Sequence, residues 1–218
     1  MNLIFLGPPG SGKGTQARRI SHELNIPHLS TGDFLREAVR DDTELGKKAR
    51  KYMEAGDLVP DDIIIELIEE KFRNGELNNG GILDGFPRTI PQAEALNMMF
   101  EKHRTVIDKV ILLAVSDQEV IKRLSGRFYC PTCHAGYNYP VQVPRKEGLC
   151  DKDGTKLLRR HDDEVDVVMN RLDVYKKQTA SIVDFYRRAN KLSEIKADDG
   201  PDLISERILK LLTEVKQV

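Results

Sequence analysis

The sequence has little cysteine and no long apolar run, and each scarcity excludes a class of protein. Three cysteines among 218 residues are too few for the disulfide framework of a small secreted protein. No stretch of eighteen apolar residues is present, and the apolar run at the start of the chain is short and has no basic segment before it. We therefore expect a cytoplasmic protein without a membrane partner.

An excess of one charge is also lacking. Lys and Arg number 34, against 35 for Asp and Glu, so any basic surface must be local. This balance argues against a dedicated nucleic-acid-binding protein. The length allows one domain with insertions.

Short apolar runs alternate with helical patterns along most of the chain. We expect strands at the runs NLIFL, PHLS, GILD, VILLAV and LSEIK, which occupy residues 2–6, 27–30, 81–84, 110–115 and 192–196. Such runs, separated by helices, are typical of a parallel sheet covered on both faces. The sequence therefore predicts an α/β protein with a parallel five-stranded sheet.

Two segments interrupt this alternation. Residues 31–59 contain two helical patterns with no strand between them, the second closed by Gly56. Residues 127–161, called the cysteine lobe below, contain aromatic residues, prolines, glycines and all three cysteines, as in a small β-rich lobe. We predict that both are inserts in a core made of the remaining residues, 1–30, 60–126 and 162–218.

Two helices are expected after the cysteine lobe. The last of them begins at Pro201. The first is a long helix over residues 162–189, predicted from a stripe of apolar residues at helical spacing: Val165, Val168, Leu172, Tyr175, Ile182 and Phe185.

The stretch GPPGSGKGT, residues 7–15, directly follows the first apolar run. A glycine-rich turn between a strand and a helix directs several backbone N–H groups at one spot, which suits a phosphate. The stretch is close to the pattern GxxxxGK[ST], but Gly14 follows Lys13 and the hydroxyl comes one residue later, at Thr15. An ordinary turn also uses glycine, yet the strand–turn–helix context favours a nucleotide site.

The run GILD ends in Asp84, and Arg88 follows four residues later. A carboxylate at the end of a strand beside a glycine loop can orient Mg²⁺ or its waters next to the phosphates. A turn capped by the same carboxylate is the alternative. Arg88 should face the crevice at the carboxyl ends of the strands, where it would hold a second phosphate.

The cysteine lobe contains the pattern C-x2-C-x16-C-x2-D, formed by Cys130, Cys133, Cys150 and Asp153. Two closely spaced pairs suit a tetrahedral zinc ion, for which an Asp oxygen is an acceptable fourth ligand. His134 is a competing fourth ligand, and three unligated thiols are the other alternative. Four protein ligands leave no position for a substrate, so such a zinc ion would be structural.

Seven motifs resemble, in order, those of the adenylate kinases: GPPGSGKGTQA, HLSTGDFLR, GDLVPD, LDGFPRT before PQA, GRFYCPTC, RRHDD and NRLDVY. The resemblance covers nearly the whole chain and is to the bacterial type with a long, zinc-containing lid. It implies a phosphate-loop α/β/α fold with a helical AMP-binding insert at 31–59 and a β-rich zinc-binding lid at 127–161. It also implies Mg²⁺-dependent, reversible phosphoryl transfer from ATP to AMP, giving two ADP, by a monomer.

The resemblance further implies the site residues. Expected ATP contacts are Gly10, Ser11, Gly12, Lys13, Gly14, Thr15, Arg123, Arg127, Gly136 and Tyr137. Expected AMP contacts are Thr31, Arg36, Asp57, Leu58, Val59, Gly85, Phe86, Pro87, Arg88, Gln92, Arg160 and Arg171, with Gln92 and the Gly85 backbone at the adenine edge. The expected catalytic residues are Lys13, Asp84, Arg88, Arg127, Arg160 and Arg171.

These residue types suit phosphoryl transfer. Planar, permanently charged guanidinium groups bind the negative charge that spreads over the phosphoryl oxygens. No general base is needed, because a monophosphate with a second pKa near 6 is largely deprotonated at neutral pH. The histidines, among them His22, His28 and His103, are therefore expected at the surface or in packing roles.

Two departures from the family pattern stand out. The sequence HAGYN at 134–138 has no hydroxyl at Gly136, although Tyr137 could still approach the ATP adenine. The stretch KADDGPD also differs where a loop should touch ATP, so that contact is not assigned to one residue.

Two other functions remain open at this stage. A nucleoside monophosphate kinase with UMP or CMP as acceptor differs only in the base, and Thr31 and Gln92 favour AMP over both. A zinc-ribbon ATPase that binds nucleic acid is the alternative from another class, but it gives no role to the LDGFPR turn or the helical insert.

Overall fold

The computed structural model describes residues 1–139 and 142–215. Within them, five strands form one parallel sheet in the order β2 (His28–Ser30), β3 (Gly81–Asp84), β1 (Asn2–Leu6), β4 (Lys109–Ala114) and β7 (Leu192–Lys196). This confirms the predicted α/β fold. Strand β1 lies between β3 and β4, and the chain passes from β1 to β2 on one side of it and from β3 to β4 on the other, so the turn after β1 opens where a ligand crevice forms in such sheets.

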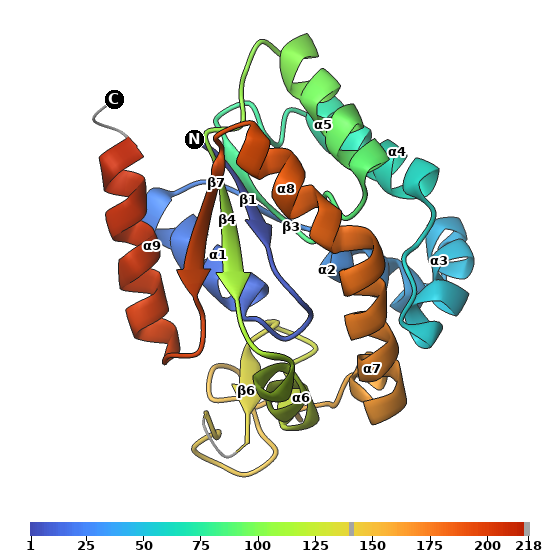
Figure 1. The fold of residues 1–218 in the computed structure, drawn as a ribbon. Helices are drawn as coiled ribbons and strands as arrows, with labels where there is room; N and C mark the ends of the chain where they lie inside the picture. Colours follow the sequence, from blue (N-terminus) through green and yellow to red (C-terminus); the bar gives the residue numbers. More distant parts are fainter. Residues whose placement is uncertain (140–141, 216–218) are drawn as a thin grey trace.

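Helices cover both faces of the sheet (Figure 1). Successive residues of a strand point to opposite faces, and in β1 Ile4 and Leu6 join one apolar cluster while Leu3 and Phe5 join the other. The first face is covered by α4 (Asp61–Arg73), α5 (Ile90–Lys102) and α8 (Ala180–Arg188), and the second by α1 (Lys13–Leu24) and α9 (Pro201–Val215).

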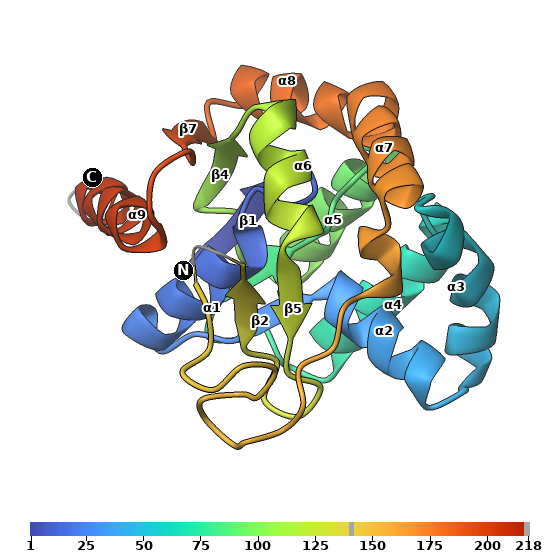
Figure 2. The ribbon, with the colours of Figure 1, turned by 90° about the horizontal axis from the view of Figure 1, so that it is seen from below.

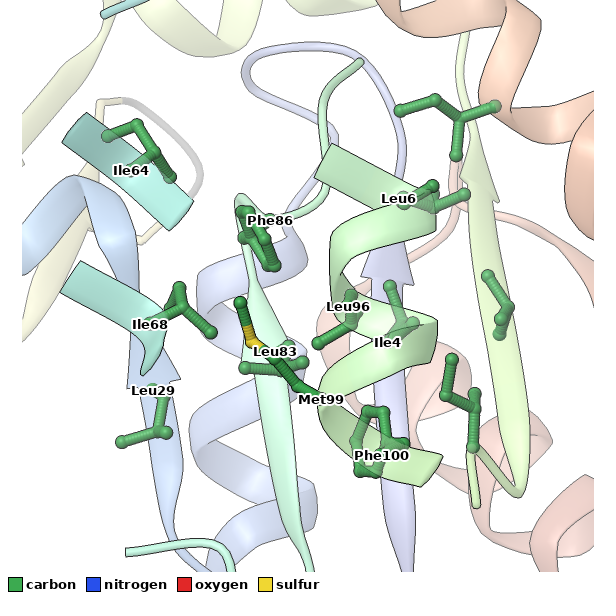
Figure 3. Close-up of a cluster of buried hydrophobic side chains, with 14 of the residues drawn as sticks. Ile4, Leu6, Leu29, Ile64, Ile68, Leu83, Phe86, Leu96, Met99 and Phe100 are labelled. Atoms are coloured by element: carbon green, nitrogen blue, oxygen red, sulfur yellow. The ribbon is translucent and has the colours of Figure 1, made fainter. Parts of the chain in front are cut away.

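The first cluster forms the larger core. Figure 3 shows Leu29 and Leu83 of the strands packed with Ile68 of α4 and with Leu96 and Phe100 of α5. Their side chains are buried, and each buried apolar side chain of this size contributes about 1.5–3 kcal/mol. This packing holds the carboxyl ends of the strands in place, where the candidate site lies.

The segment after β2 is helical, as its pattern predicts. Helix α2 (Thr31–Arg40) begins where the Ser30 hydroxyl accepts the Asp33 N–H, at 3.3 Å. Helix α3 (Glu44–Ala55) ends at Gly56, whose φ of 81° is in the left-handed region that glycine favours. The division of the chain into a core and two inserts stays a prediction.

The cysteine lobe contains a short antiparallel pair, β5 (Arg127–Tyr129) and β6 (Gly136–Asn138). Helix α6 (Asp117–Ser125) leads into it. The lobe lies beyond the carboxyl ends of the strands in Figure 1. Figure 2, seen from below, shows it in front of the sheet with α2 and α3 to one side.

The expected long helix contains a change of helical type. A short 3₁₀ turn (His161–Asp163) precedes α7 (Val165–Val174), and a π-helical stretch (Tyr175–Thr179) separates α7 from α8. Beyond the π-helical stretch the stripe continues at Ile182 and Tyr186, which are buried, whereas the predicted Phe185 is only partly buried. Val165, placed in the stripe by its spacing, is 60% exposed, so that part of the prediction is wrong.

Candidate active site

The turn after β1 directs backbone groups toward an anion. Gly7, Gly10 and Gly12 have φ of 143°, 75° and 95°, and a Cβ on Gly7 would lie 2.6 Å from the Leu113 carbonyl oxygen. Gly12 caps α1 without a side chain, so no side-chain oxygen accepts the first N–H groups of that helix. A helix N-terminus left open in this way is suited to phosphate.

Lys13 and Asp84 lie near enough beside this turn for their charges to interact. The Lys13 Nζ donates to the carbonyl oxygens of Gly7 at 2.6 Å and Pro8 at 2.8 Å. Burial lowers the pKa of Lys13 to about 7, although the charge of Asp84 opposes this shift. Burial also disfavours the charged form of Asp84, but a hydrogen bond with His28 and the charge of Lys13 outweigh it and lower the pKa of Asp84. Asp84 is therefore ionised at neutral pH.

His28 was expected only at the surface or in packing, and it is found within the site. Its Nε2 lies 3.3 Å from the Asp84 Oδ2, and its side chain is largely buried. The two strands that carry these residues are neighbours in the sheet. Without the strand order, nothing in the sequence connects the two residues.

The expected arginines converge on the same crevice. Burial, together with the charge of Arg171, lowers the pKa of Arg88 to about 10. Burial and the charges of Arg36 and Arg127 lower the pKa of Arg160 to about 9. The buried Nε of Arg160 has no hydrogen-bond partner among the described residues. Desolvated guanidinium groups that repel one another favour binding of an anion.

Carboxylates that the sequence reasoning did not assign hold these arginines in place. Asp163, which is fully buried, accepts the Arg127 Nε at 2.7 Å. Asp162 accepts the Arg171 Nη1 at 2.8 Å. Both carboxylates belong to the quoted motif RRHDD, so their position next to Arg160 was a signal that could have identified them.

A cavity of about 70 Å³ lies between the helical segment and the turn after β3. The expected AMP contacts that line it are Thr31, Arg36, Asp57, Leu58, Val59, Gly85, Arg88, Gln92 and Arg171. Phe86, Pro87 and Arg160 are not among the described residues lining it, and the Phe86 side chain is buried in the hydrophobic core. Most of the expected acceptor site is therefore brought together at one place.

Some expected ATP contacts have protein partners. Arg123 donates to the Ala197 carbonyl oxygen at 2.7 Å and to Glu119, so it borders the loop where an adenine contact was expected. The Tyr137 hydroxyl accepts the Asp151 N–H at 2.7 Å and lies 3.5 Å from the Cys150 Sγ. This side chain packs toward the cysteines, and its position gives no support to an adenine contact.

The four expected metal ligands form one cluster. One potential ligand atom from each of Cys130, Cys133, Cys150 and Asp153 lies within 4.8 Å of the others. The Sγ atoms of Cys133 and Cys150 are 3.5 Å apart, close to the roughly 3.8 Å expected for two sulfurs bound to a tetrahedral zinc ion. His134 is not part of this cluster among the described residues. The donor set fits zinc with Asp153 as the fourth ligand.

Backbone N–H groups support the thiolate form of this cluster. The Cys133 N–H lies 3.4 Å from the Cys130 Sγ, and the Lys152 N–H lies 3.4 Å from the Cys150 Sγ. Such contacts orient metal ligands and stabilise their charge.

Across the described residues, no helix has the length and apolar character needed to cross a membrane.

The open helix N-terminus after β1, the ionised strand-end carboxylate and the converging arginines define a phosphate-loop α/β protein built to hold phosphorylated ligands. The comparisons with known proteins give the family. The family model for adenylate kinase matches residues 5–191, and the chain belongs to the adenylate kinase family. It is an enzyme of that family.

Individual relatives agree with this assignment over almost the full chain. The adenylate kinase of Methanothrix thermoacetophila is 45% identical over 214 residues, or 98% of this chain and 99% of that protein. That of Archaeoglobus fulgidus is 44% identical over 216 residues, or 99% and 100%. That of Caldicellulosiruptor bescii is 49% identical over 187 residues, or 86% and 87%.

Proposed function

We propose that the protein catalyses reversible, Mg²⁺-dependent transfer of the terminal phosphoryl group of ATP to AMP, giving two ADP. The observation that carries this proposal is the group of partly buried arginines between the glycine loop and the small cavity. Arg88 and Arg171 line the cavity, and their charges, together with that of Arg127, lower the pKa of Lys13, which supports a donor site beside the acceptor site. Membership of the family supports the same activity.

On the donor side, residues Gly10–Thr15 bind the ATP phosphates through backbone N–H groups and Lys13. Without a ligand, the Lys13 Nζ donates to carbonyl oxygens of the loop. When phosphates bind, it donates to them instead. Asp84 and Thr15 would hold Mg²⁺ or its waters, which neutralises phosphate charge in such reactions. Arg123, Arg127 and the backbone of 136–137 complete this side.

On the acceptor side, Arg36 and Arg88 bind the AMP phosphate, and Arg160 and Arg171 bind the group in transfer. Catalysis consists of positioning and charge stabilisation. The cysteine lobe contains a structural zinc ion on Cys130, Cys133, Cys150 and Asp153. Closure of the lobe over the site would exclude water that could otherwise accept the phosphoryl group.

A coupled assay of ADP formed from ATP and AMP tests this function, with UMP and CMP as comparison acceptors. We expect AMP to be strongly preferred and the product to be two ADP per ATP consumed. Equal or better rates with UMP or CMP would assign another acceptor. Three further statements stay predictions: the protein is a monomer, it binds no nucleic acid, and it is cytoplasmic. Gel filtration tests the first, and a salt-dependent duplex-binding assay tests the second.

A further inference from the structure

The side-chain amide of Gln92 is held from both ends by the protein. Its Nε2 donates to the Asp61 Oδ1 at 2.7 Å, and its Oε1 accepts the backbone N–H of Arg88 at 2.7 Å. Gln92 is 1% exposed and lines the small cavity. A carboxylate can only accept and a backbone N–H can only donate, so these two partners permit one of the two amide orientations.

Asp61 is itself fixed by a second contact. It is the first residue of α4, and its Oδ2 accepts the Thr89 hydroxyl at 2.9 Å. The Thr89 hydroxyl in turn caps α5 by accepting the N–H of Gln92, at 3.3 Å. A reversed Gln92 amide would set oxygen against the Asp61 carboxylate and N–H against the N–H of Arg88, and both contacts would be repulsive.

After these contacts, the Gln92 amide retains one N–H and one oxygen lone pair for a ligand. Adenine has an amino donor next to an unprotonated ring nitrogen on its Watson–Crick edge, which complements an amide in one fixed order. Hypoxanthine, the base of IMP, has nearly the same shape but a carbonyl next to a ring N–H. The order of donor and acceptor is thus inverted. The fixed Gln92 amide would place its oxygen against the carbonyl of hypoxanthine and its N–H against the ring N–H, and both contacts would be repulsive.

We propose that Asp61 is a specificity-determining positioning residue. By fixing the orientation of Gln92, it favours acceptor nucleotides whose base has an amino group beside an unprotonated ring nitrogen, and disfavours those with a carbonyl beside a ring N–H. This inference rests on the proposed function, in which AMP occupies the cavity next to Gln92. Sites built on hydrogen bonds discriminate strongly in this way, because the wrong ligand leaves buried polar groups unpaired.

The test compares kcat/KM for AMP and for IMP, each with saturating ATP. The variants are Asp61→Asn, which is nearly isosteric and can accept or donate, and Asp61→Ala, which removes the contact. Asp62→Asn is the matched control, because Asp62 is an exposed carboxylate in the same first turn of α4. We expect the AMP-to-IMP ratio to fall about tenfold or more in Asp61→Ala and by less in Asp61→Asn, whose side-chain oxygen can still accept the Gln92 N–H, with KM for ATP unchanged and the ratio of the control unaltered.

A ratio that stays unchanged in folded Asp61→Ala would overturn the inference. So would an equal loss with AMP, IMP and ATP accompanied by a lower melting temperature, since that result describes a structural role alone. The same fall in Asp62→Asn would attribute the effect to charge at the helix terminus. If the unaltered protein forms no ADP from ATP and AMP, the proposed function fails, and the inference with it.

Discussion

The sheet core and the cysteine lobe are stabilised in different ways. Two large apolar clusters fill both faces of the core sheet, and the glycine loop after β1 projects from it. The buried cluster of the cysteine lobe contains Cys130, Tyr137, Cys150 and Leu157, so two of its members are proposed metal ligands. Function and stability should therefore be separable in the core. In the lobe they should be linked if zinc binds as proposed, since a unit of this size buries too few apolar side chains to be stable without such a metal.

The largest expected effect is on activity and comes from the core. Lys13→Ala should lower kcat by about 10²–10³-fold, because it removes a charge directed at the transferring phosphoryl group. The melting temperature should not fall, since burial already disfavours the charged amine, as its lowered pKa indicates. Steady-state kinetics and thermal unfolding measure both quantities, with the exposed Lys47→Ala as control. Near-normal turnover would remove Lys13 from the mechanism.

Arg88→Ala separates the two sides of the core site. We expect KM for AMP to rise about 10–100-fold, the range expected for a lost charged hydrogen bond to phosphate. KM for ATP should change much less, because in the proposed assignment the glycine loop binds the ATP phosphates through its backbone. Initial rates with each substrate varied in turn measure this, beside the exposed Arg40→Ala. A loss confined to ATP would mean that the two sites are assigned in reverse.

The contrast between core and lobe also explains what the sequence could predict. The strands, the glycine loop and the cysteine cluster depend on local patterns and spacings, so they follow from short stretches of sequence. The contacts between Asp84 and His28, and between Gln92 and Asp61, depend on strand order and helix packing, which no local pattern encodes. The burial of Tyr186 beside the predicted, partly buried Phe185 likewise depends on tertiary packing. The pairing of Asp163 with Arg127 spans thirty-six residues and was missed for the same reason.

Metal removal should affect the lobe and spare the core. The purified protein should contain about one zinc ion per chain, and a strong chelator should lower its melting temperature by roughly 2–4 °C for each kcal/mol that the metal contributes. Limited proteolysis should then cut within 127–161, while a nucleotide analogue still binds the glycine loop. Calorimetry and elemental analysis measure these quantities. Simultaneous loss of the core would show that the two regions are not separable, and protein without metal would reject the zinc site.

The smallest effect is expected from exchanging single ligands of the lobe. Asp153→Ala should weaken zinc binding and lower the melting temperature by less than full metal removal, because three thiolates and a water can still complete a tetrahedral site. Asp153→Cys should retain the metal, since thiolate is also a good zinc ligand. His134→Ala is the matched control, because His134 is the neighbouring alternative ligand and lies outside the cluster. Zinc competition titrations of the three variants provide the comparison. Metal kept in Asp153→Ala but lost in His134→Ala would make the histidine the fourth ligand. The position of the Asp153 carboxylate beside the three sulfurs would then not be enough to identify the side chain that binds zinc.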